Sequence, residues 1–389
     1  MKTTRKNICF VTGSRAEYGL LLPLLRKVET DKYFNLQLIA TCMHLSPEFG
    51  LTYREIERDG FIIDEKIEML LSSDSAVGIA KSMGIGCIGL AESFSRIRPD
   101  ILVLLGDRFE TFVAASIANV FRIPIVHLHG GEVTEGAFDE AFRHAITKMS
   151  LLHFTSTEQY KKRVIQLGES PDRVFNVGAI GLDNIAIFSL LSKKQLEDEL
   201  VVEFKKKNLL ITFHPVTTTI GLAQKQCNKL LNALSGCHDT LLIFTKANAD
   251  IEGRHINSMI EAFVGKEPTS RKVFSSLGQL RYLSLMQYVD AVVGNSSSGI
   301  IEAPSFKIGT INIGDRQKGR IQGSTIINCK PDEKEIMGAI RKVYSPQFKN
   351  VLKKSKNIYG TGDTAKKILS VIKTYSFTKN FTKSFYDAY

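Results

Sequence analysis

Residues 101–150 read ILVLLGDRFETFVAASIANVFRIPIVHLHGGEVTEGAFDEAFRHAITKMS. The segment opens with five apolar residues, Ile101–Leu105, a run that is typical of a strand buried on both faces of a parallel sheet. A helix-like run follows from Phe109 to Phe121, and a second buried run extends from Ile123 to Leu128. This order predicts a βαβ unit with polar residues directly after each strand.

Acidic side chains stand at the ends of these predicted strands. Asp107 follows the first strand, Glu132 follows the second, and Asp139 lies near the start of the next helix-like run. Side chains just past the carboxyl ends of parallel strands converge on one crevice, so we expect the three carboxylates to face one cavity. We expect His129 and His144 to lie in the same cavity.

The acidic trio has two interpretations. Three carboxylates with imidazoles nearby suit proton transfer and the stabilisation of positive charge on a sugar carbon. The alternative is ordinary helix capping and ion pairing with Arg108 and Arg143. We take catalysis as the working prediction.

The alternation of strand-like and helix-like runs continues along the whole chain. Further strands are predicted at 7–11, 36–41, 61–67, 152–156 and 174–177, and a second series at 209–213, 241–245, 273–275, 291–294 and 310–313. Helices are predicted at 20–29, 79–98, 158–167 and 185–204. The pattern predicts an α/β protein of two Rossmann-like domains that face a central cleft.

The predicted domain boundaries follow from a change in the sequence near residue 183, where the alternating strand-like and helix-like runs give way to an increasingly charged helical stretch. We place an N-terminal domain with the carboxylates at 1–182, a linker helix region at 183–208 and a C-terminal domain at 209–363. The tail, 364–389, is rich in aromatic residues, which disfavours disorder. We expect it to pack back on the N-terminal domain.

Composition is that of an ordinary globular protein, with 389 residues, 43% hydrophobic and 23% charged. No apolar run approaches the roughly 20 residues that cross a bilayer, and the N-terminus lacks a signal-peptide core. We therefore predict a cytoplasmic protein. Six cysteines without a CxxC pair favour free thiols over a zinc site or disulfides.

The net charge of +11 is concentrated near the C-terminus. Residues 330–389 contain 13 Lys or Arg against 5 Asp or Glu. A nucleic-acid-binding surface is one interpretation, but no aromatic-basic RNA motif accompanies these charges. A solvated helical face is favoured, and we predict neither a nucleic-acid partner nor membrane binding.

Two segments are candidates for phosphate binding. Thr12–Arg15 joins the first strand to the first helix, but it is not GxGxxG, so a nicotinamide cofactor has little support. Gly294–Gly299 follows a strand and precedes a short helix, where hydroxyls and backbone N–H groups suit an anion. A serine cap is the alternative. The segment is not GxSxG, which disfavours a serine hydrolase.

The histidines argue against a metal centre. His127 and His129 alternate along one predicted strand, so they should point to opposite faces. No HExxH pattern is present, and we predict no metal. His214 ends the first strand of the second series and is expected to face the cleft, with a structural histidine as the alternative.

Together these motifs resemble the hydrolysing UDP-N-acetylglucosamine 2-epimerases of sialic-acid pathways. The matching segments span nearly the whole chain: 12–19, 43–45, 105–108, 127–132, 139–140, 143–148, 213–215, 294–299 and 312–320. After His214 the sequence has Pro215–Thr217, where non-hydrolysing relatives have an arginine, and this favours the hydrolysing branch.

The resemblance implies a GT-B-like fold with the substrate between two Rossmann domains. The implied reaction converts UDP-N-acetylglucosamine and water into N-acetylmannosamine and UDP through 2-acetamidoglucal, for sialic acid biosynthesis. No cofactor is implied, and a homodimer is expected.

Site residues carried over by motif fall into two groups. The catalytic group is Asp107, Glu132, Asp139 and His214, with Asp107 as the base at C2 and the other two carboxylates stabilising charge and relaying protons. The substrate-binding group is Arg15, His44, His129, His144, Asn295, Ser296, Ser297, Ser298, Gly299, Glu302 and Arg320. In this group Arg15 lies near the diphosphate, the serines bind phosphate and Glu302 contacts the ribose.

Three other functions remain open from the sequence. The same chemistry on UDP-N,N′-diacetylbacillosamine, for legionaminic acid, is the nearest. A retaining glycosyltransferase of the same fold would leave C2 untouched. A nucleic-acid-binding protein built on the basic tail would bind in a salt-sensitive way, unaffected by UDP.

Overall fold

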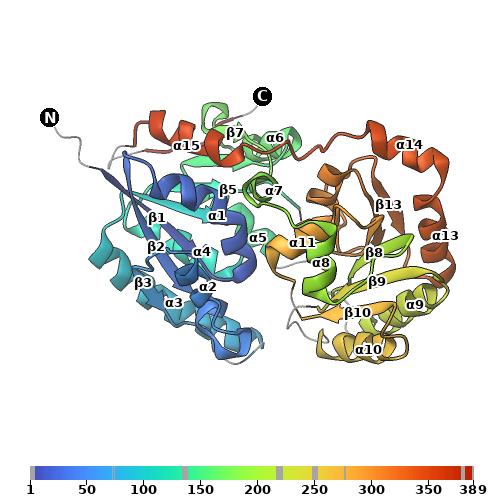
Figure 1. Cartoon of the computed structure of the whole chain (residues 1–389). Helices are drawn as coiled ribbons and strands as arrows, with labels where there is room; N and C mark the ends of the chain where they lie inside the picture. The colour runs from blue at the N-terminus through green and yellow to red at the C-terminus, as the bar shows by residue number, and fades with distance from the viewer. Residues whose placement is uncertain are drawn as a thin grey trace. The chain divides into compact units, whose positions relative to one another are not determined.

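The computed structural model describes residues 5–71, 73, 75–133, 139–215, 222–247, 253–275, 277–377 and 382–387. The described chain forms two compact units. The first contains the described residues of Met1–Glu132, Phe138–Asn184 and Gly362–Tyr389, and the second those of Ile185–Thr361. Each unit has one parallel sheet with helices, so the predicted α/β class with two Rossmann-like units is confirmed (Figure 1).

In the first unit the described strands form a sheet in the order β3-β2-β1-β4-β5-β6-β7. The strands are β1 (Lys6–Thr12), β2 (Phe34–Thr41), β3 (Glu65–Ile67), β4 (Ile101–Leu105), β5 (Ile125–Leu128), β6 (Leu152–Thr155) and β7 (Val174–Asn176). The helices are α1 (Arg15–Glu29), α2 (Tyr53–Arg58), α3 (Ala76–Ile97), α4 (Phe109–Val120), α5 (Asp139–Met149), α6 (Glu158–Gln166) and α15 (Thr364–Thr374). Short α7 (Asp183–Ile187) lies where the first unit gives way to the second.

In the second unit the described strands follow the order β10-β9-β8-β11-β12-β13. The strands are β8 (Lys207–Thr212), β9 (Thr240–Thr245), β10 (Arg271–Phe274), β11 (Ala291–Gly294), β12 (Gly309–Ile313) and β13 (Ile326–Cys329). The helices are α8 (Lys193–Leu200), α9 (Ala223–Ser235), α10 (Gly253–Gly265), α11 (Gly278–Leu285), α12 (Ser298–Ile301), α13 (Glu333–Val343) and α14 (Pro346–Lys354).

Both sheets reverse their strand order at one point, and this point matters for binding. In the first unit β1 lies between β2 and β4, and in the second β8 lies between β9 and β11. The loops that leave such a pair of strands diverge to opposite faces, which opens a crevice at the carboxyl ends. The segments after β1 and β4, and after β8 and β11, are therefore where ligands are expected.

Several predicted elements differ in the structure. The strand expected at 61–67 is reduced to β3 (Glu65–Ile67), and β13 was not predicted. The single helix expected at 185–204 is wrong, because the chain forms α7 and α8 instead. Ser192 and Gln195 make a capping box that starts α8 afresh, so the helical pattern cannot run through it.

Helix α3 bears on the prediction about membranes. By length and composition alone it suffices to cross a membrane, and it is the one such helix among the described residues. In the structure it covers the edge of the first sheet. Gly89 packs so closely on Ile67 that a Cβ there would lie 2.5 Å from Ile67 Cγ2, and Arg96 donates two hydrogen bonds to the Glu65 carboxylate.

The chain returns to the first unit at its C-terminal end. Helix α15 packs on α1 (Figure 1). The carboxylate of Asp183 accepts hydrogen bonds from the N–H groups of Thr364 (2.9 Å) and Ala365 (2.7 Å), so it caps a helix 181 residues away in sequence. Of the tail aromatics, Phe381 and Tyr389 lie outside the described residues.

Candidate active site

The turn after β4 presents Asp107, and a buried histidine supports it. His127 Nε2 donates a hydrogen bond to the carbonyl oxygen of Gly106 (2.8 Å), and Thr147 Oγ1 lies 3.2 Å from His127 Nδ1. Burial lowers the pKa of His127 to about 3, so the ring is neutral at pH 7. His127 therefore positions the backbone directly before Asp107.

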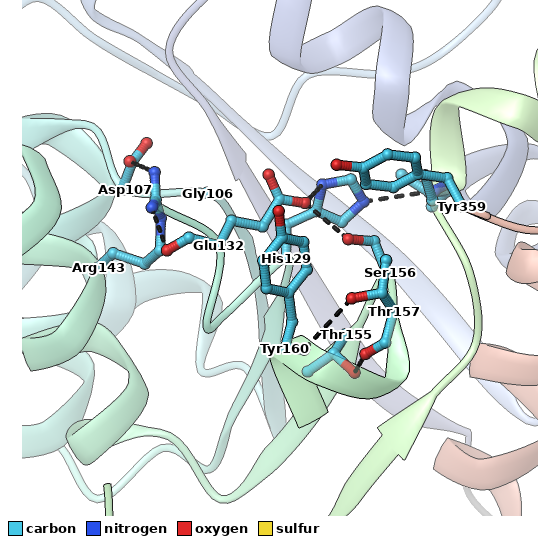
Figure 2. Close-up of polar contacts among 12 residues, drawn as sticks. Gly106, Asp107, His129, Glu132, Arg143, Thr155, Ser156, Thr157, Tyr160 and Tyr359 are labelled. Carbon is cyan, nitrogen blue, oxygen red and sulfur yellow. Dashed lines mark hydrogen bonds and ion pairs between the residues drawn. The ribbon is translucent and has the colours of Figure 1, made fainter. Parts of the chain in front are cut away.

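Arg143, from α5, joins the ends of two strands. Its guanidinium forms an ion pair with the Asp107 carboxylate and donates to the carbonyl oxygen of Glu132 (2.5 Å) and to Glu140 Oε2 (3.0 Å). The side chain is only 4% exposed, and Figure 2 shows its guanidinium beside Asp107. The ion pair of Arg143 with Asp107 agrees with the alternative interpretation of these residues, whereas Arg108 pairs with Glu110 rather than with any of the three carboxylates.

The Glu132 carboxylate is fixed from two sides. Ser156 Oγ, at the end of β6, donates to Glu132 Oε1 (2.8 Å), and His129 Nδ1 lies 3.2 Å from the same oxygen. The N–H of Ile180 donates to His129 Nε2 (3.3 Å), so the ring proton is on Nδ1 and points to Glu132 (Figure 2). Ser156 was missed, although its place after a strand would have identified it.

His129 does not lie on the strand as predicted. Strand β5 ends at Leu128, and His129 adopts a left-handed backbone conformation with φ 65°. The prediction that His127 and His129 alternate along one strand is therefore wrong. The turn sends His127 toward Gly106 and His129 toward Glu132, each in its own hydrogen-bond network.

Asp139 is the first residue of α5, one helical turn before Arg143. Burial, and then the negative charge of Asp107, raise the pKa of Asp139 to about 6. A carboxyl group with such a pKa exchanges its proton close to neutral pH. His144, on the same helix, is about one-third exposed, and its Nε2 lies 3.5 Å from Glu140 Oε1.

The turn after β1 holds the predicted phosphate contact, Arg15. Helix α1 begins at Arg15 rather than at Leu20, and the Ser14 side chain caps it by accepting from the N–H of Glu17. Arg15 Nε donates to Glu55 Oε2 on α2 (2.9 Å), and both side chains are more than a third exposed. Arg15 is thus at the surface beside the first crevice.

His44 is buried in the same region and is held by two hydroxyl groups. Its Nε2 lies 3.2 Å from Thr12 Oγ1, and its Nδ1 lies 2.8 Å from Thr52 Oγ1. Burial lowers its pKa to about 4, so the ring is neutral. In this structure His44 ties the turn after β1 to the segment before α2, which is a positioning role.

A second acidic cluster behind the crevice was not predicted. Arg108 Nε donates to Glu110 Oε1 (2.5 Å), and Glu110 is completely buried. Glu17 Oε2 accepts from the N–H of Gly13 (2.7 Å), and burial, with the nearby charge of Glu110, raises the pKa of Glu17 to about 8. A Cβ on Gly13 would lie 2.3 Å from Glu110 Oε1, so the glycine lets these groups approach.

In the second unit a reciprocal pair of hydrogen bonds joins the segments after β8 and β11. Asn295 Oδ1 accepts from the N–H of His214 (2.8 Å), and Asn295 Nδ2 donates to the His214 carbonyl (2.8 Å). Burial, and then the positive charge of Arg316, lower the pKa of His214 to about 3. His214 is therefore a neutral imidazole with its backbone fixed.

The serine segment has supports that the sequence did not reveal. Ser298 begins α12, and its Oγ lies 2.5 Å from Tyr282 Oη and 3.1 Å from Ser296 Oγ. Arg316 Nη1 and Gln317 Nε2 both donate to the Asn295 carbonyl (2.9 Å each). These two residues lie in the predicted motif 312–320, but no pattern in the sequence indicated their target.

The remaining predicted residues lie close by in the same unit. Ser297 precedes α12, whose residue Gly299 contacts Thr310 so closely that a Cβ would lie 2.6 Å from Thr310 Cγ2. Glu302 ends α12. The N–H of Arg320 donates to the Gln317 carbonyl (3.2 Å). The structure thus gathers the predictions into two groups, one for each unit.

Metal-ligating residues are not clustered in the described parts of the chain. Across those ranges no three His, Cys, Asp or Glu side chains are arranged to hold a metal ion. All six cysteines are described and free, as predicted. Residues 216 and 217, which carried the departure from the non-hydrolysing pattern, lie outside the described residues.

Comparisons with known proteins identify the family of this chain. The family model of UDP-N-acetylglucosamine 2-epimerase matches residues 26–373. GDP/UDP-N,N′-diacetylbacillosamine 2-epimerase (hydrolyzing) of Campylobacter jejuni is 45% identical over 346 residues, covering 89% of each chain. Polysialic acid biosynthesis protein P7 of Escherichia coli is 39% identical over 386 residues, covering 98% of this chain and 97% of that one.

Solved structures support the fold independently. The UDP-GlcNAc 2-epimerase from Neisseria meningitidis bound to UDP-GlcNAc matches with a TM-score of 0.83 at 17% identity, covering 95% of this chain and 100% of that one. The predicted GT-B-like fold is confirmed by this match. The extent of the family match and the identity to hydrolysing relatives show that the chain belongs to the UDP-N-acetylglucosamine 2-epimerase family, in its hydrolysing branch.

Proposed function

We propose that this enzyme converts UDP-N-acetylglucosamine and water into N-acetylmannosamine and UDP, in the cytoplasm, as a step toward sialic acid. The sugar would lie against the carboxylates of the first unit, and the UDP would lie against the His214 and Ser296–Ser298 segments of the second. The nearest support for this substrate is the family description and the relative in polysialic acid biosynthesis.

The observation that carries the proposal is the position of Arg143, which pairs with the Asp107 carboxylate, donates to the backbone carbonyl of Glu132 and lies on α5 one turn after Asp139. Arg143 ties the ends of β4 and β5 to α5, and the negative charge of Asp107 acts on Asp139. Departure of UDP from C1 builds positive charge on the sugar, which carboxylates in a water-poor site offset. Three carboxylates with different partners suit a reaction that needs a base, a charge stabiliser and a proton relay.

The roles follow from the contacts of each carboxylate. Asp107 would remove the C2 proton as UDP leaves, which gives the 2-acetamidoglucal. Glu132, held by Ser156 and His129, would stabilise the charge at C1. Asp139, with its pKa near 6, would relay protons as water adds to C1 and a proton returns to the opposite face of C2.

The second unit would hold the leaving group. Asn295 fixes the backbone of His214, whose neutral ring would be a hydrogen-bonding partner for UDP. The hydroxyls of Ser296 and Ser298 already form a chain with Tyr282, which orders them before any ligand binds. We assign Asn295 a positioning role because both ends of its side-chain amide are engaged by His214.

A second candidate substrate is UDP-N,N′-diacetylbacillosamine. It is favoured by the 45% identity to the Campylobacter jejuni enzyme, which is the higher of the two identities reported above. The same carboxylates would act at C1 and C2, and only contacts to the sugar's C4 and C6 substituents would differ.

The decisive experiment supplies each UDP-sugar, and the GDP form of the bacillosamine derivative, to the purified full-length protein in heavy water. We expect UDP and N-acetylmannosamine from UDP-N-acetylglucosamine alone, with deuterium at C2. Turnover of only a bacillosamine derivative would select the second candidate. A released sugar without label at C2 would contradict the elimination route and with it the proposal.

Amide variants test the assignment of the carboxylates. Asp107→Asn and Glu132→Gln should abolish turnover while UDP still binds, because UDP binding is assigned to the other unit. Isothermal titration with UDP provides the binding measurement. Glu48→Gln, an exposed carboxylate in the same unit, is the matched control and should leave turnover within about twofold.

A further inference from the structure

The last described segment of the chain, 382–387, inserts one side chain into the first unit. Within that segment only Lys383 is not exposed. Its Nζ donates to the carbonyl oxygens of Thr147 (3.3 Å), Lys148 (2.8 Å) and Ser150 (2.8 Å). The same ammonium lies 2.6 Å from Glu169 Oε2. A charged group, which the sequence analysis had not singled out, thus helps to anchor the tail.

The receiving site is built from buried groups. Glu169 is completely buried and also accepts from Lys148 Nζ (2.7 Å) and lies 2.9 Å from His153 Nε2. Burial lowers the pKa of His153, so its ring is neutral and the charge of Glu169 is met by the two lysines. Removing Lys383 would leave a buried carboxylate with one of its two cations.

Two of the three carbonyls belong to the last turn of α5. A helix leaves its final carbonyl groups without partners inside the helix, and a cation there also opposes the negative end of the helix dipole. Lys383 supplies both the donors and the charge. The opposite end of this helix carries Asp139, and Arg143 lies between the two ends.

Gly168 allows the described tail segment, 382–387, to pack closely against the first unit. The N–H of Tyr386 donates to the carbonyl of Gly168 (3.0 Å), and Lys148 Nζ lies 4.7 Å from the centre of the Phe385 ring. Gly168 has φ 87°, and a Cβ there would lie 2.3 Å from the ring of Phe385. Only glycine lets the tail approach this closely.

We infer that Lys383 is a positioning residue, which clamps the carboxyl end of α5 and thereby holds Asp139 and Arg143 in register with Asp107. The catalytic consequence rests on the proposed function, in which these groups act on the sugar. The clamp itself rests only on the contacts above. A tail that merely neutralises Glu169 would stabilise the fold without affecting the alignment of α5.

The test compares Lys383→Met with Lys373→Met in the full-length protein. Methionine keeps much of the length of lysine but has neither charge nor donors. Lys373 is the matched control because it lies on the preceding α15 and pairs with Asp31, away from α5. Hydrogen exchange of the α5 amides is measured for each, together with kcat and KM for whichever UDP-sugar is turned over.

For Lys383→Met we expect α5 amides to exchange about tenfold faster, while those of α1 and β4 keep their rates. We expect kcat to fall on the order of tenfold to a hundredfold, because small misplacements of catalytic groups are costly. KM and UDP affinity should stay within about twofold. Lys373→Met should leave α5 exchange and kcat unchanged, and Lys383→Arg should recover part of the loss.

Unchanged exchange in α5 for Lys383→Met would overturn the clamp. Faster exchange with unchanged kcat would overturn the positioning role. If the unmodified enzyme turned over no UDP-sugar, the proposed function would fail by itself, and α5 exchange would still decide the clamp. Should Lys383→Met fail to fold, Lys383→Arg, which keeps the charge with another geometry, carries the same comparison.

Discussion

In the first unit, some residues near Asp107 form ion pairs and others position the backbone or a carboxylate. Arg143 contacts the carboxylates of Asp107 and Glu140 and the backbone carbonyl of Glu132. The neutral ring of His127 holds the backbone at Gly106, and His129 lies against the Glu132 carboxylate. The residue that links the Asp107 carboxylate to the backbone of Glu132 is thus a cation that the sequence marked only as a possible ion-pair partner.

Replacing Arg143 by methionine should inactivate the enzyme. The change leaves Asp107 partly buried without its cation, so we expect a loss of about 3 kcal/mol of folding stability. We expect kcat to fall on the order of a hundredfold or more. Urea unfolding and steady-state kinetics measure the two effects. Arg143→Lys keeps the positive charge but lacks the planar guanidinium that can donate to several acceptors at once. If this variant were as active as the unmodified enzyme, the contacts of the guanidinium would not be needed for activity.

The rate should depend on the ionisation of Asp139. Its pKa is raised from 3.8 to about 6, so it is protonated below that pH and ionised above it. Because a proton relay must be ionised before it can accept a proton, we expect kcat to fall as the pH drops through about 6. The positive charge of Arg143 lowers the pKa of Asp139. In Arg143→Met the fall of kcat on the acidic side of the pH–rate profile should therefore begin at a higher pH. If the fall of kcat below about pH 6 were unchanged in Asp139→Asn, the ionisation of another group would be its cause.

At the scale of elements, both candidate half-sites lie where the strand order reverses. The groups after β1 and β4, and those after β8 and β11, are placed there by the topology of the two sheets. Within each crevice, glycines set how closely the segments approach. Gly294, at the end of β11, is the strongest case.

Replacing Gly294 by alanine should disrupt the second half-site. Gly294 has φ 134°, and a Cβ would lie 1.9 Å from the carbonyl oxygen of Thr212. The strands β8 and β11 would have to separate, which would break the pair between His214 and Asn295. We expect UDP binding to be lost and stability to fall by about 3 kcal/mol, both measurable by titration calorimetry and thermal unfolding.

Gly338 provides the matched control for that change. It lies inside α13, and a Cβ there would meet no atom within 4 Å. Alanine favours a helix more than glycine does, so Gly338→Ala should stabilise the protein by up to about 1 kcal/mol. Equal effects of the two substitutions would show that backbone geometry at Gly294 is not the cause.

At the scale of the whole molecule, the chain leaves the first unit near residue 184 and returns to it near residue 362. The return is made by α15, whose first N–H groups are capped by Asp183 rather than by the residue directly before the helix. The described tail then reaches α5 through Lys383. The C-terminal segment thus belongs to the same unit as the carboxylates.

Replacing Asp183 or Asp363 by asparagine should affect folding stability to different extents. Asp183→Asn loses part of a buried cap, so we expect a loss of about 1 to 2 kcal/mol and looser packing of α15. Asp363 occupies the N-cap position but makes no capping bond, and asparagine tolerates its left-handed backbone, so Asp363→Asn should change stability by less than about 0.5 kcal/mol. Thermal unfolding with hydrogen exchange of α15 distinguishes the two.

Much of this protein follows from local patterns that any reader of the sequence can apply. Apolar runs such as Ile101–Leu105 predict buried parallel strands, and the rule that polar groups after such strands converge placed Asp107, Glu132 and Asp139 together. The failures have local causes as well: the capping box at Ser192 divides a predicted helix, and His129 lies in a turn after β5 instead of on the strand.

What only the tertiary structure decided are the partners of those groups. Arg143 pairs with Asp107 across 36 positions, Asn295 holds His214 across 81, and Lys383 reaches the end of α5 across 235. Periodicity and strand ends are properties of neighbouring residues, so the sequence alone determined the fold class and the candidate carboxylates. Contacts between distant side chains form only when the sheets assemble, and burial then sets their charges and pKa values.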